Sequence, residues 1–213
     1  SGKSTILHLL LRYFDVNKGN ITIDGIDIRD LSLRKLRSLI GFVPQKAVLF
    51  SGNIESNIKY LDESLEDNTI KKAAQIAEAE EFILSKDKKY KTPISEYGSN
   101  VSGGQKQRLS IARALVGSPN ILLFDDSFSA LDYKTDFKVR ENIHKNLTNK
   151  TVVIVAQRIA TILHADKIIV LDKGEVVGVG THEELLKKNK IYKEIAESQL
   201  SKEELTTGGK NEK

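Results

Sequence analysis

The sequence contains no cysteine, no methionine and no tryptophan, and it has only 3 prolines among its 213 residues. Without cysteine the chain can form no disulfide framework, no thiolate zinc site and no cysteine nucleophile. No uninterrupted apolar run approaches the roughly 18 residues that a membrane-spanning helix needs. Because methionine is missing even at position 1, we expect the sequence to be a fragment of a longer protein.

Charge of neither sign dominates the sequence. There are 33 Lys and Arg residues and 29 Asp and Glu residues, which gives a formal net charge of +4, and the two signs alternate along the chain. Hydrophobic residues make up 39% and charged residues 29%, which is ordinary for a globular protein and argues against disorder. A mixed, solvated surface is the simplest interpretation, so we expect no nucleic-acid partner.

Hydrophobic periodicity predicts an α/β fold. Continuous apolar runs at 121–124 and 152–155 suit strands that are buried on both faces of a parallel sheet. We expect further strands at 20–24, 39–43, 167–172 and 175–180, and helices at 68–84, 102–115, 183–188 and 191–200. The predicted domain covers residues 1–200, with a helical insertion between about 55 and 116, and residues 201–213 form a polar tail.

The first five residues carry the end of a phosphate-binding loop. They are Ser1, Gly2, Lys3, Ser4 and Thr5, and an apolar helical pattern follows them directly. Backbone N–H groups at such a turn and helix start form a cradle for phosphate oxygens. Lys3 can then reach the β- and γ-phosphates, and the Ser4 hydroxyl can hold Mg²⁺. The full pattern needs a glycine four residues further upstream, which lies before Ser1 and supports the fragment interpretation.

Two carboxylates follow the apolar run at 121–124. They belong to Asp125 and Asp126, at the carboxyl end of a predicted buried strand, where open α/β sheets bind their ligands. Asp125 could hold Mg²⁺ or its water shell. A solvated turn is the alternative for this pair taken alone, but the phosphate-loop residues upstream favour the metal.

A third motif lies at the start of the helix predicted at 102–115. Ser102 is a good N-cap residue, and Gly103 and Gly104 allow a ligand to approach the backbone closely before Gln105. A helix N-terminus with a serine hydroxyl suits an anion. An ordinary capped helix is the alternative.

Together these motifs resemble the nucleotide-binding domain of an ABC transporter over nearly the whole chain. Gln45 matches the Q-loop, 101–105 the signature motif, 121–125 Walker B, and Asp132 the D-loop. The resemblance implies a P-loop NTPase fold with a mainly parallel sheet, a small antiparallel β part and a helical subdomain. It implies ATP and Mg²⁺ as cofactors, with Ser4, Gln45 and Asp125 at the metal.

The same resemblance implies partners and a location. Two such domains pair head to tail, and each ATP lies between one domain's phosphate loop and the other's signature helix. Transmembrane domains of the same polypeptide would hold the domain at the cytoplasmic face of the membrane and carry small molecules or lipids. The segment 49–58 resembles exporters more than importers.

Two positions depart from the family pattern. Asp126 stands where a catalytic Glu is usual, and Gln157 stands where the switch His is usual. Asp is one methylene shorter, and Gln cannot titrate. With Gln45 they form the predicted catalytic set, and the pattern resembles the degenerate subunit of a bacterial heterodimeric multidrug-type exporter. The near-intact signature would then complete the hydrolytic site of a non-identical partner.

Three alternatives stay open on the sequence. The chain could be a fully active ATPase subunit of a homodimeric exporter. It could be a soluble ABC-type ATPase that acts on DNA or ribosomes, although the helical insertion is short and carries no heptads. It could also be a purely structural dimerisation module.

Overall fold

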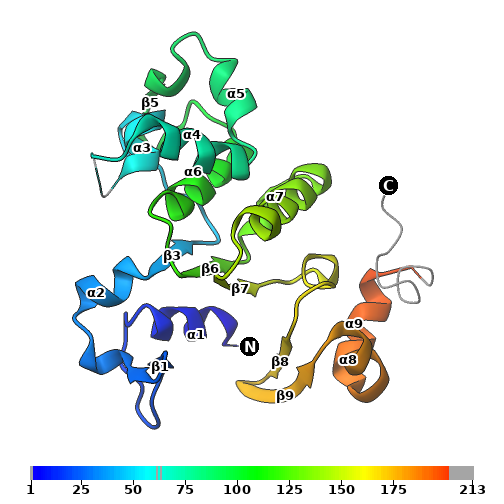
Figure 1. Ribbon diagram of the computed structural model, residues 1–213. Helices are drawn as coiled ribbons and strands as arrows, with labels where there is room; N and C mark the ends of the chain where they lie inside the picture. The colour runs from blue at the N-terminus through cyan, green and yellow to red at the C-terminus, as the bar shows by residue number, and fades with distance from the viewer. Residues whose placement is uncertain (1, 61, 63, 202–213) are drawn as a thin grey trace.

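The computed structural model describes residues 2–60, 62 and 64–201 and has the expected α/β architecture (Figure 1). Its strands are β1 Thr22–Ile23, β2 Ile26–Asp27, β3 Ile40–Val43, β4 Gly52–Asn53, β5 Pro93–Ile94, β6 Ile121–Asp125, β7 Thr151–Val155, β8 Ile168–Asp172 and β9 Glu175–Gly180. Its α-helices are α1 Lys3–Leu10, α2 Leu33–Ser38, α3 Ile54–Lys59, α4 Asp67–Ile76, α5 Glu80–Leu84, α6 Gly103–Val116, α7 Tyr133–Asn146, α8 His182–Lys188 and α9 Lys190–Gln199.

A parallel three-stranded sheet in the order β3-β6-β7 lies at the centre. Its register pairs Phe42 with Leu123 and Leu123 with Val153. The pairs β1-β2, β4-β5 and β8-β9 are small antiparallel sheets. This mixture of a parallel core sheet with antiparallel ribbons and helices agrees with the P-loop NTPase fold that the resemblance implies.

The middle strand β6 is buried on both faces because its side chains alternate between two cores. Leu122 and Phe124 face a large cluster that includes residues of α3 to α7. Leu123 faces the other way and packs with Leu7 of α1. Burying each such side chain contributes roughly 1.5–3 kcal/mol. The sheet is thereby fixed between α1 and α6, and the residues after β6 are held in place.

The helices α3 to α6 gather at one end of the molecule, at the top of Figure 1. The strands β8 and β9 and the helices α8 and α9 form a separate cluster near the chain's C-terminal end, around Tyr192 and Ala196.

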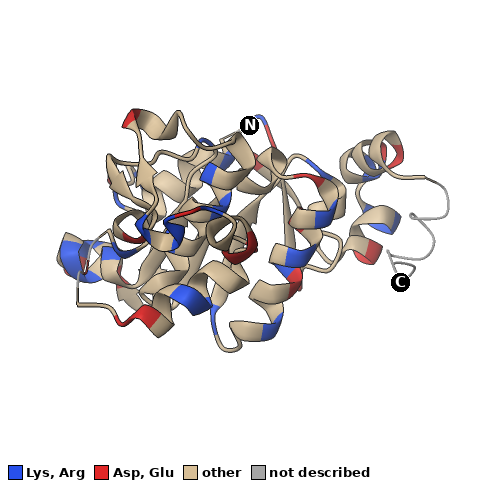
Figure 2. Cartoon of the chain, turned by 90° about the horizontal axis from the view of Figure 1, so that it is seen from above, with Lys and Arg blue, Asp and Glu red and all other residues tan. Residues whose placement is uncertain are grey.

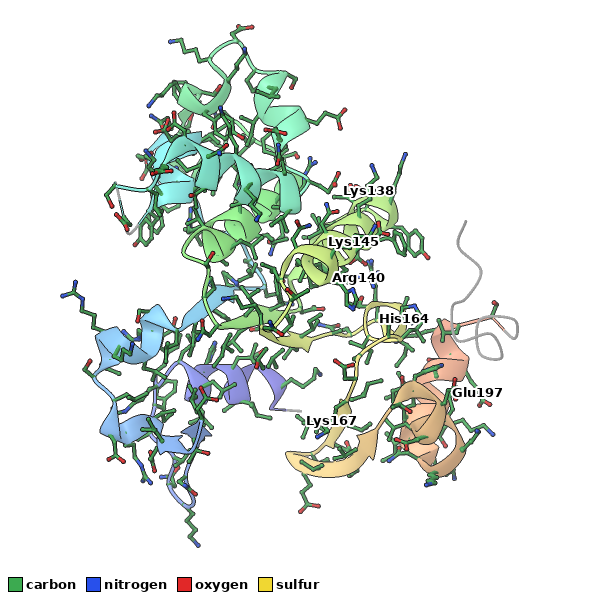
Figure 3. The ribbon with its side chains drawn as sticks, viewed as in Figure 1. Lys138, Arg140, Lys145, His164, Lys167 and Glu197 are labelled. Carbon is green, nitrogen blue, oxygen red and sulfur yellow. The ribbon has the colours of Figure 1, made fainter. Side chains whose placement is uncertain are left out.

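Lys and Arg are interspersed with Asp and Glu over the cartoon (Figure 2). Figure 3 shows Lys138, Arg140 and Lys145 along α7, where Arg140 Nε lies 2.7 Å from Asp136 Oδ1.

The expectation that β7 is buried on both faces was wrong. Val152 is 37% exposed, because β7 lies at the edge of the sheet and no described strand pairs with its outer side. The single helix expected at 68–84 is also wrong: it breaks between α4 and α5, where Glu78 has a φ of 53°. The strand expected at 20–24 is shorter and forms a hairpin with β2.

The other predicted strands and helices are confirmed within one or two residues at each end. Among the described residues, none of the helices combines the length and the apolar character that crossing a membrane requires. All of the polar tail beyond Ser201 lies outside the described residues.

Candidate functional site

The phosphate-loop residues begin α1. Gly2 is its N-cap with a φ of 87°, a left-handed conformation that glycine adopts without strain. Lys3 and Ser4 are half-buried, Thr5 is exposed, and Ser1 lies outside the described residues. The Ser4 hydroxyl donates a 2.8 Å hydrogen bond to Asp125 Oδ1. Two motifs that are 121 residues apart in sequence therefore meet at one edge of the sheet.

The pair of Ser4 and Asp125 offers oxygen ligands only. Asp125 ends β6 and is 7% exposed. A hydroxyl and a carboxylate are donors that suit Mg²⁺, which usually keeps several waters and takes oxygens from substrate phosphates. No group of three or more His, Cys, Asp or Glu that could hold a metal occurs among the described residues. The donor set thus fits a magnesium ion that is bound together with a nucleotide.

Asp126 lies at the centre of the predicted catalytic set. Its Oδ2 accepts a 2.7 Å hydrogen bond from Gln157 Nε2 and a 3.2 Å hydrogen bond from Gln45 Nε2. Gln45 follows β3 and Gln157 follows β7, and the carboxyl ends of parallel strands meet at one edge of the sheet. The structure therefore brings all three side chains together.

The backbone of Asp126 is fixed in a special conformation. Its φ is 47°, a left-handed value that is uncommon for a residue with a side chain. Its N–H donates to Val155 O at 2.8 Å, and its carbonyl accepts from the Ser129 hydroxyl at 2.7 Å. Asp126 is 8% exposed, and these two bonds fix its backbone between the sheet and the following turn.

The signature residues form the first turn of α6. Ser102 Oγ accepts from Gln105 N at 3.3 Å, and Gln105 Oε1 accepts from Ser102 N at 3.1 Å. This capping box leaves the Ser102 hydroxyl proton available to a ligand. Gly103 has open space where a Cβ would stand, and a Cβ at Gly104 would meet only the Ala130 carbonyl oxygen, at 3.8 Å.

Asp132 lies at the start of α7, after the turn that carries Ala130. Its carboxylate accepts from Thr135 N at 3.0 Å and caps the helix. Hydrogen bonds from the Thr135 side chain and backbone lower the pKa of Asp132. A Cβ added to Gly104 would come within 3.8 Å of the Ala130 carbonyl oxygen, so the first turn of α6 lies beside this turn and the predicted D-loop and signature residues are neighbours.

Sequence reasoning missed the polar residues that support these loops. Gln107 and Asn57 are each 1% exposed, and Arg113 extends from the same helix as Gln107. They bind mainly backbone oxygens of the chain that follows β3. A backbone acceptor has no signature in the sequence, so only their polarity at positions of low exposure could have indicated a role.

The comparisons agree with this geometry. The chain matches the ABC transporter family over residues 1–129. It is 43% identical over 205 residues to the mitochondrial ABC transporter B family member 24 of Arabidopsis thaliana, covering 96% of this chain and 30% of that protein. It is 41% identical over 213 residues to ATP-binding cassette sub-family B member 6 of Xenopus tropicalis, covering all of this chain and 25% of that protein.

A solved structure is also similar. The structure of a bacterial Atm1-family ABC exporter with ATP bound superposes with a TM-score of 0.90 at 39% identity, covering 94% of this chain and 35% of that one. This chain therefore belongs to the ABC transporter family, and it has the fold of an ABC nucleotide-binding domain. Domains of this family bind ATP and are ATPases, and those of ABC exporters pair as dimers and work with transmembrane domains. The chain spans about a third or less of these relatives' length.

Proposed function

We propose that this chain is the ATP-driven motor domain of a heterodimeric exporter and that its own ATP site is degenerate. The observation that carries the proposal is the environment of Asp126, whose Oδ2 accepts from both Gln157 and Gln45. Neither amide gains or loses a proton near neutral pH, so neither can relay one. A carboxylate that is one methylene shorter than Glu, on a backbone fixed by the sheet, reaches less far towards an attacking water.

This arrangement should lower the rate of ATP hydrolysis at this chain's own site strongly. A misplacement of about 1 Å can lower a rate on the order of 100-fold. Lys3, Ser4 and Asp125 would still bind ATP with Mg²⁺, whose role is to neutralise phosphate charge. The expected result is a site that holds ATP for long periods. Ser102, Gly103 and Gly104 would complete the partner's hydrolytic site in a head-to-tail pair.

The remaining parts of the proposal concern the whole protein. Transmembrane domains of the same polypeptide would move small molecules or lipids, with this domain at the cytoplasmic face of a bacterial cell membrane. Support comes from the similarity to exporter domains and from the bacterial exporter structure. The non-identical partner would bring its own Glu and His at the positions of Asp126 and Gln157.

The test is steady-state ATP turnover of the full-length subunit purified alone. Wild type is compared with the Asp126→Glu, Gln157→His double variant. We expect wild type to be nearly silent and the double variant to gain rate. Adding Lys3→Ala to the double variant should remove the gain, which would assign the recovered rate to this site. Wild-type turnover of roughly 1–10 per second would contradict the proposal and indicate an active homodimer.

A further inference from the structure

The loop that follows β7 is held by a side chain from the end of α9. Gln199 Nε2 donates a 3.0 Å hydrogen bond to the carbonyl oxygen of Gln157, which lies 42 residues earlier in the chain. Gln199 Oε1 accepts a 2.8 Å hydrogen bond from the backbone N–H of Ile159. One carboxamide therefore binds two backbone groups, one on each side of Arg158.

The local conformation of the loop explains how one side chain reaches both groups. Arg158 is extended, with a φ of −100° and a ψ of 127°. In an extended segment, the carbonyl of one residue and the N–H of the residue two places further on point to the same side. The Gln199 carboxamide thus pairs with the loop as the backbone of a neighbouring strand would.

The bond to Ile159 also caps a short helix. Ile159 is the first residue of the 3₁₀-helix η5 (Ile159–Thr161). The first N–H groups of a helix have no partner inside it, and within the described chain the side chain of Arg158 does not cap η5. Gln199 supplies the missing acceptor, so the turn after the loop is fixed to α9.

Apolar packing holds α9 against the same turn. Ile159 is 5% exposed and lies in one core cluster with Ala196 and Leu200, which flank Gln199 on α9 and just after it. Ala196 is fully buried, and its carbonyl accepts a 2.9 Å hydrogen bond from Leu200 N. The backbone that carries Gln199 cannot leave Ile159 without exposing apolar surface, which is unfavourable in water.

The other end of the loop is held by the central sheet. Val155 is the last residue of β7 and pairs with Asp125 of β6. Its carbonyl accepts a 2.8 Å hydrogen bond from Asp126 N. The loop at 156–158 is therefore anchored by the sheet before it and by α9 after it, and between these anchors the Gln157 amide lies 2.7 Å from Asp126 Oδ2.

We propose that Gln199 is a positioning residue that orients Gln157 in this chain's own ATP site. The inference rests on the proposed function in one respect, which is that Gln157 belongs to this ATP site. It holds whether or not the site hydrolyses ATP.

The position of Gln157 indicates what its orientation would affect. Its partner Asp126 directly follows Asp125, which binds the Ser4 hydroxyl of the phosphate loop. Ser4 and Lys3 are the residues placed for Mg²⁺ and for the β- and γ-phosphates. A glutamine amide at this edge would donate to the terminal phosphate, which ATP has and ADP lacks. Gln199 should therefore act on the preference of the site for ATP over ADP.

The test measures this preference on the full-length chain in the assembled transporter. Photolabelling of this chain by azido-ATP is competed with ADP or with AMP-PNP, a non-hydrolysable analogue that keeps the terminal phosphate. Labelling of this chain reports its own site even when a partner also binds nucleotide.

The main variant is Gln199→Met, which keeps the length of the side chain and removes both polar groups. Gln199 is exposed, so each of its two bonds contributes modestly. We expect AMP-PNP affinity to fall roughly threefold to tenfold and ADP affinity to change by less than about twofold. Losses of equal size for the two nucleotides would show a general structural effect and overturn the proposal.

A second variant and a control are available on the same helix. Gln199→Glu keeps an acceptor for Ile159 N but loses the donor to Gln157 O, so it should also lose AMP-PNP affinity selectively, and it serves if Gln199→Met does not assemble. Glu197→Met is the control, because Glu197 is exposed on α9 (Figure 3) and its Oε1 lies 3.7 Å from Lys193 Nζ. It should leave both affinities as in wild type. A selective loss in Glu197→Met would assign the effect to the surface of α9 and overturn the role of Gln199.

Gln157→Ala separates this inference from the proposed function. We expect it to lower AMP-PNP affinity selectively, and adding Gln199→Met should cost no more than about twofold further, because Gln199 acts through Gln157. Losses that multiply would overturn the inference. If Gln157→Ala leaves AMP-PNP affinity unchanged, the placement of Gln157 in the proposed site is wrong, and the inference with it. A selective loss in Gln157→Ala alone, with Gln199→Met as in wild type, would overturn only the inference.

Discussion

The amide nitrogen of Gln157 lies 2.7 Å from Oδ2 of Asp126 and donates to it, so the two residues at which the sequence predicts a departure from the family pattern are hydrogen-bonded to each other. Both come from loops that leave neighbouring strands, β6 and β7. A carboxylate that accepts a hydrogen bond from a neutral amide is oriented but has no group to pass a proton to. The two side chains therefore form one local arrangement.

Substituting the signature serine should stop the assembled transporter more completely than substituting Asp126. Ser102→Arg places a long cation at the helix start that we propose completes the partner's site, and turnover should be abolished. Asp126→Asn changes a site that already contributes little, so most turnover should remain. ATP turnover of the heterodimer measures both. Equal losses from the two variants would count against the assignment of the sites.

Removing the Ser4 hydroxyl should weaken nucleotide binding only when magnesium is present. Ser4→Ala deletes one of the two oxygens that meet at 2.8 Å beside the phosphate loop. We expect ATP affinity of the full-length protein to fall at least about tenfold with Mg²⁺ and to change little in EDTA. Ser38→Ala, at an exposed serine on α2 outside the site, is the control. A loss of equal size in EDTA would show that the hydroxyl acts without the metal.

The sequence was informative about this site because its chemistry depends on residue types at fixed places along strands. Asp125 and Asp126 could be placed at a strand end because the preceding residues are all apolar. Their meeting with Ser4, Gln45 and Gln157 follows from parallel strands whose carboxyl ends share one edge. The hydrogen-bond pattern itself, with two amides on one carboxylate oxygen, could not be predicted.

Tertiary contacts determine the features of the fold that the sequence did not predict. The helix expected at 68–84 has continuous helical periodicity, yet it breaks at Glu78. There Arg108 Nη1 binds the Glu78 carbonyl, and Asn142 Nδ2 binds its carboxylate at 2.8 Å. The apolar sequence of β7 resembles that of β6. However, β7 pairs with a described strand on one side alone, and Val152 is exposed. Neither outcome has a local signal.

Adding a methyl group at Gly41 should destabilise the domain strongly. Gly41 lies in β3, where a Cβ would overlap the Ala114 carbonyl oxygen of α6 and approach Leu122 Cδ2 to 2.8 Å. Overpacking of this kind costs typically about 1–3 kcal/mol, and a carbonyl of the helix backbone cannot move aside as a side chain can. We expect Gly41→Ala to lower the thermal unfolding midpoint of the full-length protein clearly.

Gly117→Ala is the control for Gly41→Ala. Gly117 follows α6 with a φ of −78°, and nothing lies within 4 Å of the place a Cβ would take. This substitution should change the free energy of unfolding by less than about 1 kcal/mol. A similar drop in the unfolding midpoint for both variants would rule out the close approach of β3 and α6 as the cause.

Acidification should destabilise the C-terminal cluster through His182. His182 is 3% exposed, its Nδ1 lies 2.8 Å from the Tyr192 hydroxyl, and its Nε2 has no hydrogen-bond partner among the described residues. Burial lowers the pKa of His182 below 6.5. The charge of Glu183 raises this pKa, and His164, which lies in the loop before β8 (Figure 3), lowers it further. As the pH falls through 6.5, the unfolded chain takes up a proton before the folded chain does.

The folded state therefore loses stability as the pH falls below 6.5, and the loss stops growing once the pH reaches the lowered pKa of the folded state. The free energy of unfolding falls by no more than about 1.4 kcal/mol for each pH unit. Unfolding midpoints of the full-length protein between about pH 7.5 and about pH 5.5 measure it, these two values being about one unit to either side of an ordinary histidine pKa. His182→Gln should flatten the curve because glutamine does not titrate. His144→Gln, at an exposed position on α7, should leave the curve as in wild type. If His182→Gln keeps the wild-type slope, the acid sensitivity arises from another group.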